Sequence, residues 1–389
     1  MAIPISYNVR NVLQRPVSTL TTAIGVGLTV AIFIGALSLV SGFRAAMLTT
    51  GSPANAIALR KGADSEISSG INRDGANILR AIPDVAAGPD GRPLVSAELV
   101  VVTNKERLGQ KGSSNVTVRG VDAGSLTLRD RVKIVEGRMF TPGTDEVIAG
   151  SRIARRFANC AVGDRIRFGQ REFTVVGHFS AAGSAFESEI WGDNPVLMPA
   201  LQRDDVFQSL TFRMRDPARF AALKKELEAD PRLQIQLKRE SEFYDEQSGL
   251  LSRAILPLGI FITIIMAVGA VFGAMNTMYA AVGSRTREIA TLLVLGFSPF
   301  AIMVSFVFES VFLALIGGLI GCLIALPING ITTSTTNFQS FSEVAFAFRI
   351  TPAALATGMI FAAAMGLVGG FLPALRAARQ TIASSLRGG

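Results

Sequence analysis

The sequence predicts a membrane protein with four transmembrane α-helices, one ahead of and three behind a large α/β extracytoplasmic domain. Four stretches are almost free of Lys, Arg, Asp and Glu: residues 16–43, 254–284, 289–342 with Glu309 as the one charge, and 350–375. A bilayer core of about 30 Å needs about 20 apolar residues in a helix, so each stretch is long enough to cross it. Sequence of ordinary soluble composition separates the first two stretches, whereas the last three follow one another closely.

The formal charge of +8 is distributed unevenly along the chain. Residues 44–253 hold 30 basic and 27 acidic side chains, so this part is nearly balanced. Seven of the other basic residues share one side of the membrane if all four stretches cross it: Arg10, Arg15, Arg285, Arg287, Arg376, Arg379 and Arg387. The positive-inside rule makes that side cytoplasmic, together with both termini. Residues 44–253 and the loop near 327–349 are then outside. No basic face remains for nucleic acid, which excludes that class of partner.

The four spans are expected at about 18–41, 255–280, 299–325 and 351–373. Ahead of the first span, residues 3–14 place apolar side chains at helical spacing. An amphipathic helix on the inner leaflet is expected there, with a solvated tail as the alternative. The chain thus divides into residues 1–43 with that helix and span 1, the external domain 44–253, and residues 254–389 with spans 2–4.

The external domain reads as mixed α/β. Strand-like segments at 55–60 and 94–103 enclose a helical segment at 73–82, and a second unit of the same order follows at 209–214, 216–229 and 233–237. These two βαβ-like units flank a β-rich centre at about 115–200, in which residues 164–168 and 172–177 predict a hairpin. Two subdomains are therefore expected in this part.

Three of the expected spans carry glycines four residues apart. Such spacing lets helices approach closely, which favours packing inside a lipid bilayer. The three pairs are Gly269 and Gly273, Gly317 and Gly321, and Gly366 and Gly370.

The sequence lacks the residues of common catalytic sites. It contains no Gly-Lys dipeptide and hence no Walker A loop, and His178 is its single histidine. One histidine excludes a His-based metal cluster and a conventional Ser-His-Asp triad. A chain without catalytic residues, metal or bound cofactor is expected, with His178 in a structural role.

The segment 276–296 is polar at its centre and apolar on both sides. The polar segment Gly283–Glu288 follows the end of span 2. Apolar residues then occur again at Ile289, Leu292 and Leu293, before Gly296. This pattern predicts a short amphipathic helix at 284–296 on the inner membrane surface, with Arg285, Arg287 and Glu288 reaching solvent or a partner. An ordinary turn with positive-inside arginines is the alternative.

This segment resembles the coupling-helix signature of the FtsX/MacB-like ABC permeases, in which an Asn opens a run that ends in Arg-x-Arg-Glu-Ile, then Leu and Gly. Other segments are similar to that family in the same order: the basic segment 8–22, Glu309 ahead of the Gly-rich 317–321, and Pro-Ala-x-Arg-Ala-Ala at 373–378. Residues 135–140 and 147–157, with 163–164, resemble its periplasmic core.

The resemblance implies a permease subunit of the mechanotransmission type in a bacterial inner membrane. It implies a cytosolic ATPase on a separate chain, which would bind ATP and Mg²⁺ and contact Arg285, Arg287 and Glu288. It also implies a second permease subunit, identical or not, and a periplasmic adaptor. The substrate is not indicated.

Glu309 lies about ten residues into span 3, or about 15 Å deep at 1.5 Å per residue. A carboxylate there should face other helices rather than lipid. An interhelical or dimer contact is expected, with proton coupling as the alternative, although the spans offer no second ionisable group for a relay.

Two rival functions share parts of this pattern. A transmembrane regulatory subunit that activates a periplasmic hydrolase or signals to a sensor kinase would have the same fold and the same ATPase. A membrane-anchored binding protein without an ATPase would leave the 284–296 segment unexplained.

Overall fold

A computed structural model describes residues 16–89, 91–109 and 111–380. The expected helix at 3–14 and the arginines Arg10, Arg15 and Arg387 lie outside these residues.

The chain divides into two compact units. The helical unit comprises residues up to Ser41, Arg253–Ile331 and residues from Phe348; the sheet unit comprises Gly42–Ser252 and Thr332–Ala347.

Among the described residues, the helical unit is built from five α-helices, of which α2 and α8 continue into the sheet unit: α2 (Pro16–Thr50), α8 (Glu240–Ser284), α9 (Thr286–Val294), α10 (Pro299–Ala325) and α11 (Pro352–Ala378). The four long helices are long and apolar enough to cross a membrane, by length and composition. The expected bounds of span 3 match α10. By contrast, α2 continues nine residues beyond 41, and α8 begins at Glu240 rather than near 255. Hydropathy marks only the apolar part of these two helices.

Capping residues define where α10 and α11 begin. The Ser298 side chain accepts a hydrogen bond from the backbone N–H of Ala301, and Thr351 does the same for Ala354. Each cap is followed by a proline at the first helical position, where its missing N–H costs nothing. A short 3₁₀ turn, η3 (Leu326–Ile328), follows α10.

Small residues let the helices of the helical unit pack closely. A Cβ atom at Gly317 would lie 2.7 Å from the Ala23 carbonyl oxygen of α2, and one at Gly321 would lie 2.5 Å from that of Gly27. On α11, Gly366 lies against α10, where the Ser310 hydroxyl donates to its carbonyl oxygen at 2.7 Å. A Cβ at Gly370 would lie 2.4 Å from that of Ser310.

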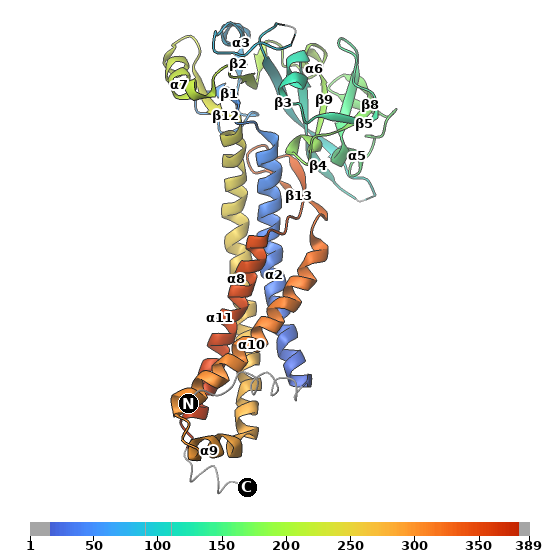
Figure 1. The fold of residues 1–389 in the computed structure, drawn as a ribbon. Helices are drawn as coiled ribbons and strands as arrows, with labels where there is room; N and C mark the ends of the chain where they lie inside the picture. The colour runs from blue at the N-terminus through green and yellow to red at the C-terminus, as the bar shows by residue number, and fades with distance from the viewer. Residues whose placement is uncertain (1–15, 90, 110, 381–389) are drawn as a thin grey trace. The chain divides into compact units, whose positions relative to one another are not determined.

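The sheet unit contains one ten-stranded sheet in the order β12-β1-β11-β3-β4-β9-β6-β8-β5, with β7 paired to β8. Figure 1 labels β1, β3, β4, β5, β8, β9 and β12 of this sheet. Its strands are β1 (Asn55–Arg60), β3 (Val95–Glu106), β4 (Ser113–Val121), β5 (Lys133–Gly137), β6 (Glu146–Gly150), β7 (Arg165–Phe168), β8 (Arg171–Ser180), β9 (Glu189–Asp193), β11 (Ser209–Arg213) and β12 (Ile235–Arg239). The short strands β2 (Ile71–Asn72) and β10 (Val206–Phe207) pair with each other. Its helical segments are α3 (Arg73–Arg80), α4 (Ala123–Leu128), α5 (Ser151–Ala154), η1 (Ala185–Ser188), α6 (Asn194–Ala200), η2 (Pro217–Arg219) and α7 (Phe220–Ala229).

The two βαβ-like units are interleaved in this sheet. β1 pairs antiparallel with both β11 and β12, and β11 pairs antiparallel with β3. Each of the two βαβ-like units therefore contributes every second strand of the series β12-β1-β11-β3, which is the arrangement of a split βαβ fold. Leu79 of α3 and Leu223 of α7 are buried in the same core. The strands of the central region continue the sheet through the β3–β4 pairing.

The predicted hairpin is confirmed as β7 and β8, which pair antiparallel from Arg165 with Thr174 to Phe168 with Arg171. Gly169 in its turn has φ +58°, a left-handed conformation that glycine adopts without strain. A second hairpin, β13 (Thr332–Thr336) and β14 (Glu343–Ala347), occupies the loop between α10 and α11 and belongs to the sheet unit.

Candidate coupling site and buried ionic junction

The segment predicted as amphipathic forms α9, which runs across the direction of α8 (Figure 1). Gly296 follows it with φ +90°. The backbone N–H groups of Gly296 and Phe297 donate to the carbonyl oxygens of Leu293 and Leu292 at 3.1 Å each. This is a Schellman motif, which explains why the helix ends at this glycine.

One side of α9 is buried and another is exposed. Ile289 and Ala290 are buried, and Ile289 packs in a cluster with Met278 of α8 and Ile302 of α10. Arg287 and Glu288 are exposed. The helical unit therefore holds α9 by its apolar side, which leaves an acidic and a basic side chain of consecutive residues at the surface.

Arg285, between α8 and α9, forms a buried ion pair with Glu309 of α10. Its Nη1 lies 3.0 Å from Oε2 and 3.3 Å from Oε1 of Glu309, and the two side chains are only 6% and 8% exposed. The expectation that Arg285 reaches solvent is wrong, because the chain turns from α8 into α9 at this residue and directs the guanidinium inward. Glu309 thus has an ionisable partner, which lies just beyond the expected end of span 2 at residue 280. The sequence offered one signal, since a carboxylate in an apolar stretch requires a partner.

The glycine pair Gly269 and Gly273 differs from the other two pairs, because no helix packs against it. No atom lies within 4 Å of a Cβ built at Gly269 or Gly273 of α8. Both glycines line a groove of about 560 Å³ between α2 and α8, together with Gly25 and Thr29 of α2. The groove is lined largely by small side chains.

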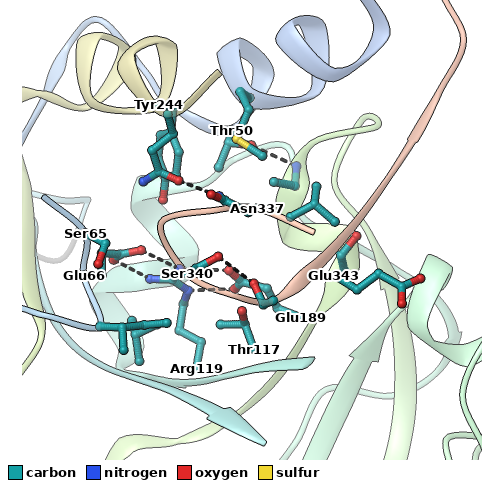
Figure 2. A pocket seen from close by; sticks show the side chains of 18 residues that line it. Thr50, Ser65, Glu66, Thr117, Arg119, Glu189, Tyr244, Asn337, Ser340 and Glu343 are labelled. Atoms are coloured by element: carbon teal, nitrogen blue, oxygen red, sulfur yellow. Dashed lines mark hydrogen bonds and ion pairs between the residues drawn. The ribbon is translucent and has the colours of Figure 1, made fainter. Parts of the chain in front are cut away.

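A second polar site lies inside the sheet unit, centred on Arg119 of β4. Arg119 is 1% exposed and donates to three carboxylates: to Glu66 at 2.8 and 2.9 Å, to Glu98 at 2.7 Å, and to Glu189 at 2.7 and 2.9 Å. Figure 2 shows Arg119 with Glu66 and Glu189. Arg129 donates to both carboxylate oxygens of Glu98, one of which also accepts from Arg119. Burial alone would raise the pKa of Glu98, but Arg129 and Arg119 outweigh it and lower that pKa to about 2.

Several segments of the sheet unit meet at this ionic cluster. Thr50 from the end of α2, Tyr244 and Gln247 from α8, and Asn337 and Glu343 of the 332–347 segment line a cavity of about 40 Å³ with Arg119 (Figure 2). The cavity has room for a few water molecules but not for a transported molecule. Its position, at the ends of α2 and α8, favours a structural junction over a binding pocket.

Sequence reasoning missed both Arg119 and Glu343. Arg119 interrupts the apolar strand segment Val116–Val121, and a charge at such a position was a signal for a buried pair. Glu343 follows a polar run and gave no comparable signal.

His178 makes hydrogen bonds to Glu136 at 2.8 Å and to the Cys160 carbonyl oxygen at 2.7 Å. Within the described residues, no group of His, Cys, Asp and Glu is arranged to hold a metal ion.

Two family models match this chain. The model described as MacB-like periplasmic core domain matches residues 19–230, and that described as FtsX-like permease C-terminal matches residues 260–382. The first alone covers more than half of the chain.

Curated relatives include the macrolide export ATP-binding/permease protein MacB of Bordetella avium, 25% identical over 367 residues that cover 85% of this chain and 54% of that protein. MacB 1 of Aeromonas hydrophila is 24% identical over 364 residues, covering 83% and 54%. The chain thus spans about half the length of these relatives. The periplasmic region of MacB from Actinobacillus actinomycetemcomitans aligns with 50% of this chain and 92% of its own, at 14% identity and a TM-score of 0.37.

The matched residues follow the order of the fold, with the periplasmic core model over α2 to α7 and the permease model from within α8 to α11. The chain belongs to the FtsX/MacB-like ABC transporter permeases.

Proposed function

We propose that this chain is the permease subunit of an ATP-driven transporter of the mechanotransmission type, which couples cytosolic ATP hydrolysis to export or extraction of a substrate on the periplasmic side. The chain itself is non-catalytic on this proposal, and a partner ATPase binds ATP and Mg²⁺. The observation that carries the proposal is α9. Its apolar side is buried against α8 and α10, while Arg287 and Glu288 remain exposed for a protein partner.

The Arg285–Glu309 ion pair supports a revised role for Arg285. Since its guanidinium is buried, we assign Arg285 to fixing the start of α9 against α10 rather than to direct ATPase contact. Arg287 and Glu288 then form the contact. A buried ion pair keeps its geometry because separating the charges leaves each one unpaired at a cost of several kcal/mol. A push on α9 is thereby passed to α10.

Two continuous helices provide a route from the helical unit to the sheet unit. α2 runs from Pro16 to Thr50 across the boundary at Ser41, and α8 runs from Glu240 to Ser284 across that at Ser252. Because an α-helix carries its own backbone hydrogen bonds, displacement of one end moves the other end. On this mechanism no continuous tunnel through the membrane is needed.

The assembly we propose contains two permease subunits, identical or different, with two ATPases and a periplasmic adaptor in the inner membrane, and both chain termini in the cytoplasm. The open groove at Gly269 and Gly273 supports contact between permease subunits, because small side chains let helices of two chains approach closely. Four spans per chain would give eight in the dimer.

The test is the substitution Glu288→Lys, with affinity purification of the chain from native membranes and identification of the proteins that co-elute. We expect wild-type protein to retain a Walker-motif ATPase and the variant to lose it by at least about tenfold, since like charges brought together at an interface cost on the order of several kcal/mol. Undiminished ATPase recovery with Glu288→Lys would refute the coupling role of α9.

Glu226→Lys is the matched control, because Glu226 is an exposed glutamate on the helix α7 of the sheet unit. It should leave ATPase recovery unchanged. A periplasmic adaptor in the wild-type eluate would support transport, whereas a cell-wall hydrolase or sensor kinase in its place would favour a regulatory subunit.

A further inference from the structure

The 332–347 hairpin gives the helical and sheet units two connections besides α2 and α8. The chain passes between the units at Ser41–Gly42, Ser252–Arg253, Ile331–Thr332 and Ala347–Phe348. The first two passages lie within α2 and α8. The last two are the legs of the hairpin, which join it to α10 on one side and to α11 on the other.

Glu343 anchors this hairpin on the sheet. Its side chain is 4% exposed and lies between two arginines, with Oε2 at 2.5 Å from Nη2 of Arg107 and Oε1 at 2.9 Å from Nη2 of Arg156. Arg107 follows β3, and Arg156 follows α5. The next residues add backbone contacts: the N–H of Ala345 donates to the Ser188 hydroxyl at 2.9 Å.

The hairpin also contacts the parts of α2 and α8 that belong to the sheet unit. Asn337 donates to the Gln247 side chain of α8 at 2.8 Å, and both groups are buried (Figure 2). Phe346 packs edge-on against Phe43 of α2, with ring centroids 5.4 Å apart. A Cβ at Gly42 would lie 2.1 Å from the Ala347 carbonyl oxygen, so only glycine allows this approach.

The two legs of the hairpin have little slack. Three residues separate η3 from β13, and four separate β14 from α11. Fully extended, such segments span at most about 10–15 Å. They are also paired, since the N–H of Gly330 donates to the Phe348 carbonyl at 2.9 Å and that of Phe348 donates to Ile331 at 3.0 Å. Displacement of α10 or α11 therefore pulls on the hairpin.

We propose that Glu343 is a positioning residue for transmission: its ion pairs with Arg107 and Arg156 hold the 332–347 hairpin on the sheet, so that movement of α10 and α11 reaches the sheet unit by a route separate from α2 and α8. The inference rests on the proposed function. It deepens that function by giving α10, which is bonded to the start of α9 through Glu309, its own connection to the sheet.

The electrostatics of Glu343 agree with a charged anchor. Burial would raise the pKa of Glu343, but hydrogen bonds from Ser334 and Ser114 and the charges of Arg156 and Arg107 together lower it. The carboxylate is therefore ionised at neutral pH. Its removal leaves two arginines that are 30% and 35% exposed and can be hydrated, so Glu343 variants should still fold.

The first measurement is hydrogen exchange of the full chain in lipid nanodiscs, without ATPase. In Glu343→Gln, amides of β13 and β14 should exchange about tenfold faster than in wild type, because the hairpin loses its charged anchor. Glu343→Asp keeps the charge and should restore much of the protection. The control Glu146→Gln breaks the Arg138–Glu146 pair of the same unit and should leave the hairpin unchanged. Equal hairpin exchange in wild type and Glu343→Gln would overturn the proposal.

The second measurement compares exchange with and without trapped nucleotide in the ATPase complex. Wild-type protein should show a nucleotide-dependent change in β3 and β4, and Glu343→Gln should lose at least half of it while retaining the ATPase. A full response in Glu343→Gln would overturn the transmission role and leave the proposed function intact. If wild-type protein binds no ATPase, the proposed function fails, and the role of Glu343 in transmission fails with it.

Discussion

Arg119 is buried in the interior of the sheet unit and donates to three buried carboxylates from different segments. Removing one member of a buried ionic cluster leaves the other charges unpaired, at about 3–5 kcal/mol. Arg119→Leu should therefore destabilise the sheet unit by that amount. Trp191, the one tryptophan of the chain, is buried and donates to Glu189 at 2.7 Å, so its fluorescence reports unfolding of this unit.

The control at the residue scale is Arg138→Leu. Arg138 pairs with Glu146 but its side chain is 56% exposed, and exposed ion pairs contribute about 0–1 kcal/mol. Denaturant unfolding of the full chain in detergent, followed by Trp191 fluorescence, should separate the two variants clearly. Similar midpoints for Arg119→Leu and Arg138→Leu would show that burial does not set the contribution of the Arg119 cluster.

At the scale of elements, the sequence predicted the strands and helices whose pattern is local. The segments 55–60 and 209–214 alternate or run apolar and form β1 and β11, and residues 299–325 are apolar between clear caps and form α10. The sequence did not predict that α8 begins at Glu240, because its first turns are polar and are held by the sheet unit. It also missed the β13–β14 hairpin, whose polar strand Thr332–Thr336 is ordered by contacts distant in sequence, such as that of Arg156 with the Ser334 hydroxyl.

The glycine pairs behave differently at the same scale, although the sequence pattern is identical. Gly317 is closed in by α2, so Gly317→Leu should force α2 and α10 apart and lower the thermal stability of the single chain. A Cβ built at Gly269 meets open space. Gly269→Leu should leave the stability of the chain nearly unchanged and weaken association of two permease subunits, as measured by native electrophoresis in mild detergent. Loss of chain stability in Gly269→Leu, with association intact, would contradict this assignment.

At the scale of the whole molecule, the set of segments that form the sheet unit constrains the membrane topology independently of hydropathy. The 332–347 hairpin packs with residues 42–252 in one compact unit, so we expect both on the same side of a membrane. If α9 lies on the opposite side, α10 must cross to reach the hairpin, and α11 must cross back. Because α2 and α8 also leave the sheet unit, the four passages between units correspond to the four spans expected from composition.

This topology predicts which positions a membrane-impermeant maleimide can reach. In a Cys160→Ser, Cys322→Ser background, single cysteines at Lys111 and Phe338 test the sheet unit and its hairpin, and one at Thr291 tests α9; all three positions are exposed. Lys111→Cys and Phe338→Cys should react in intact spheroplasts, whereas Thr291→Cys should react only after permeabilisation. Reaction of Thr291→Cys in intact spheroplasts would place α9 beyond the reach of a cytosolic ATPase. Protection of Phe338→Cys alone would contradict the expectation that α10 and α11 cross, and with it the common side of hairpin and sheet that the packing of Glu343 with Arg107 and Arg156 predicts.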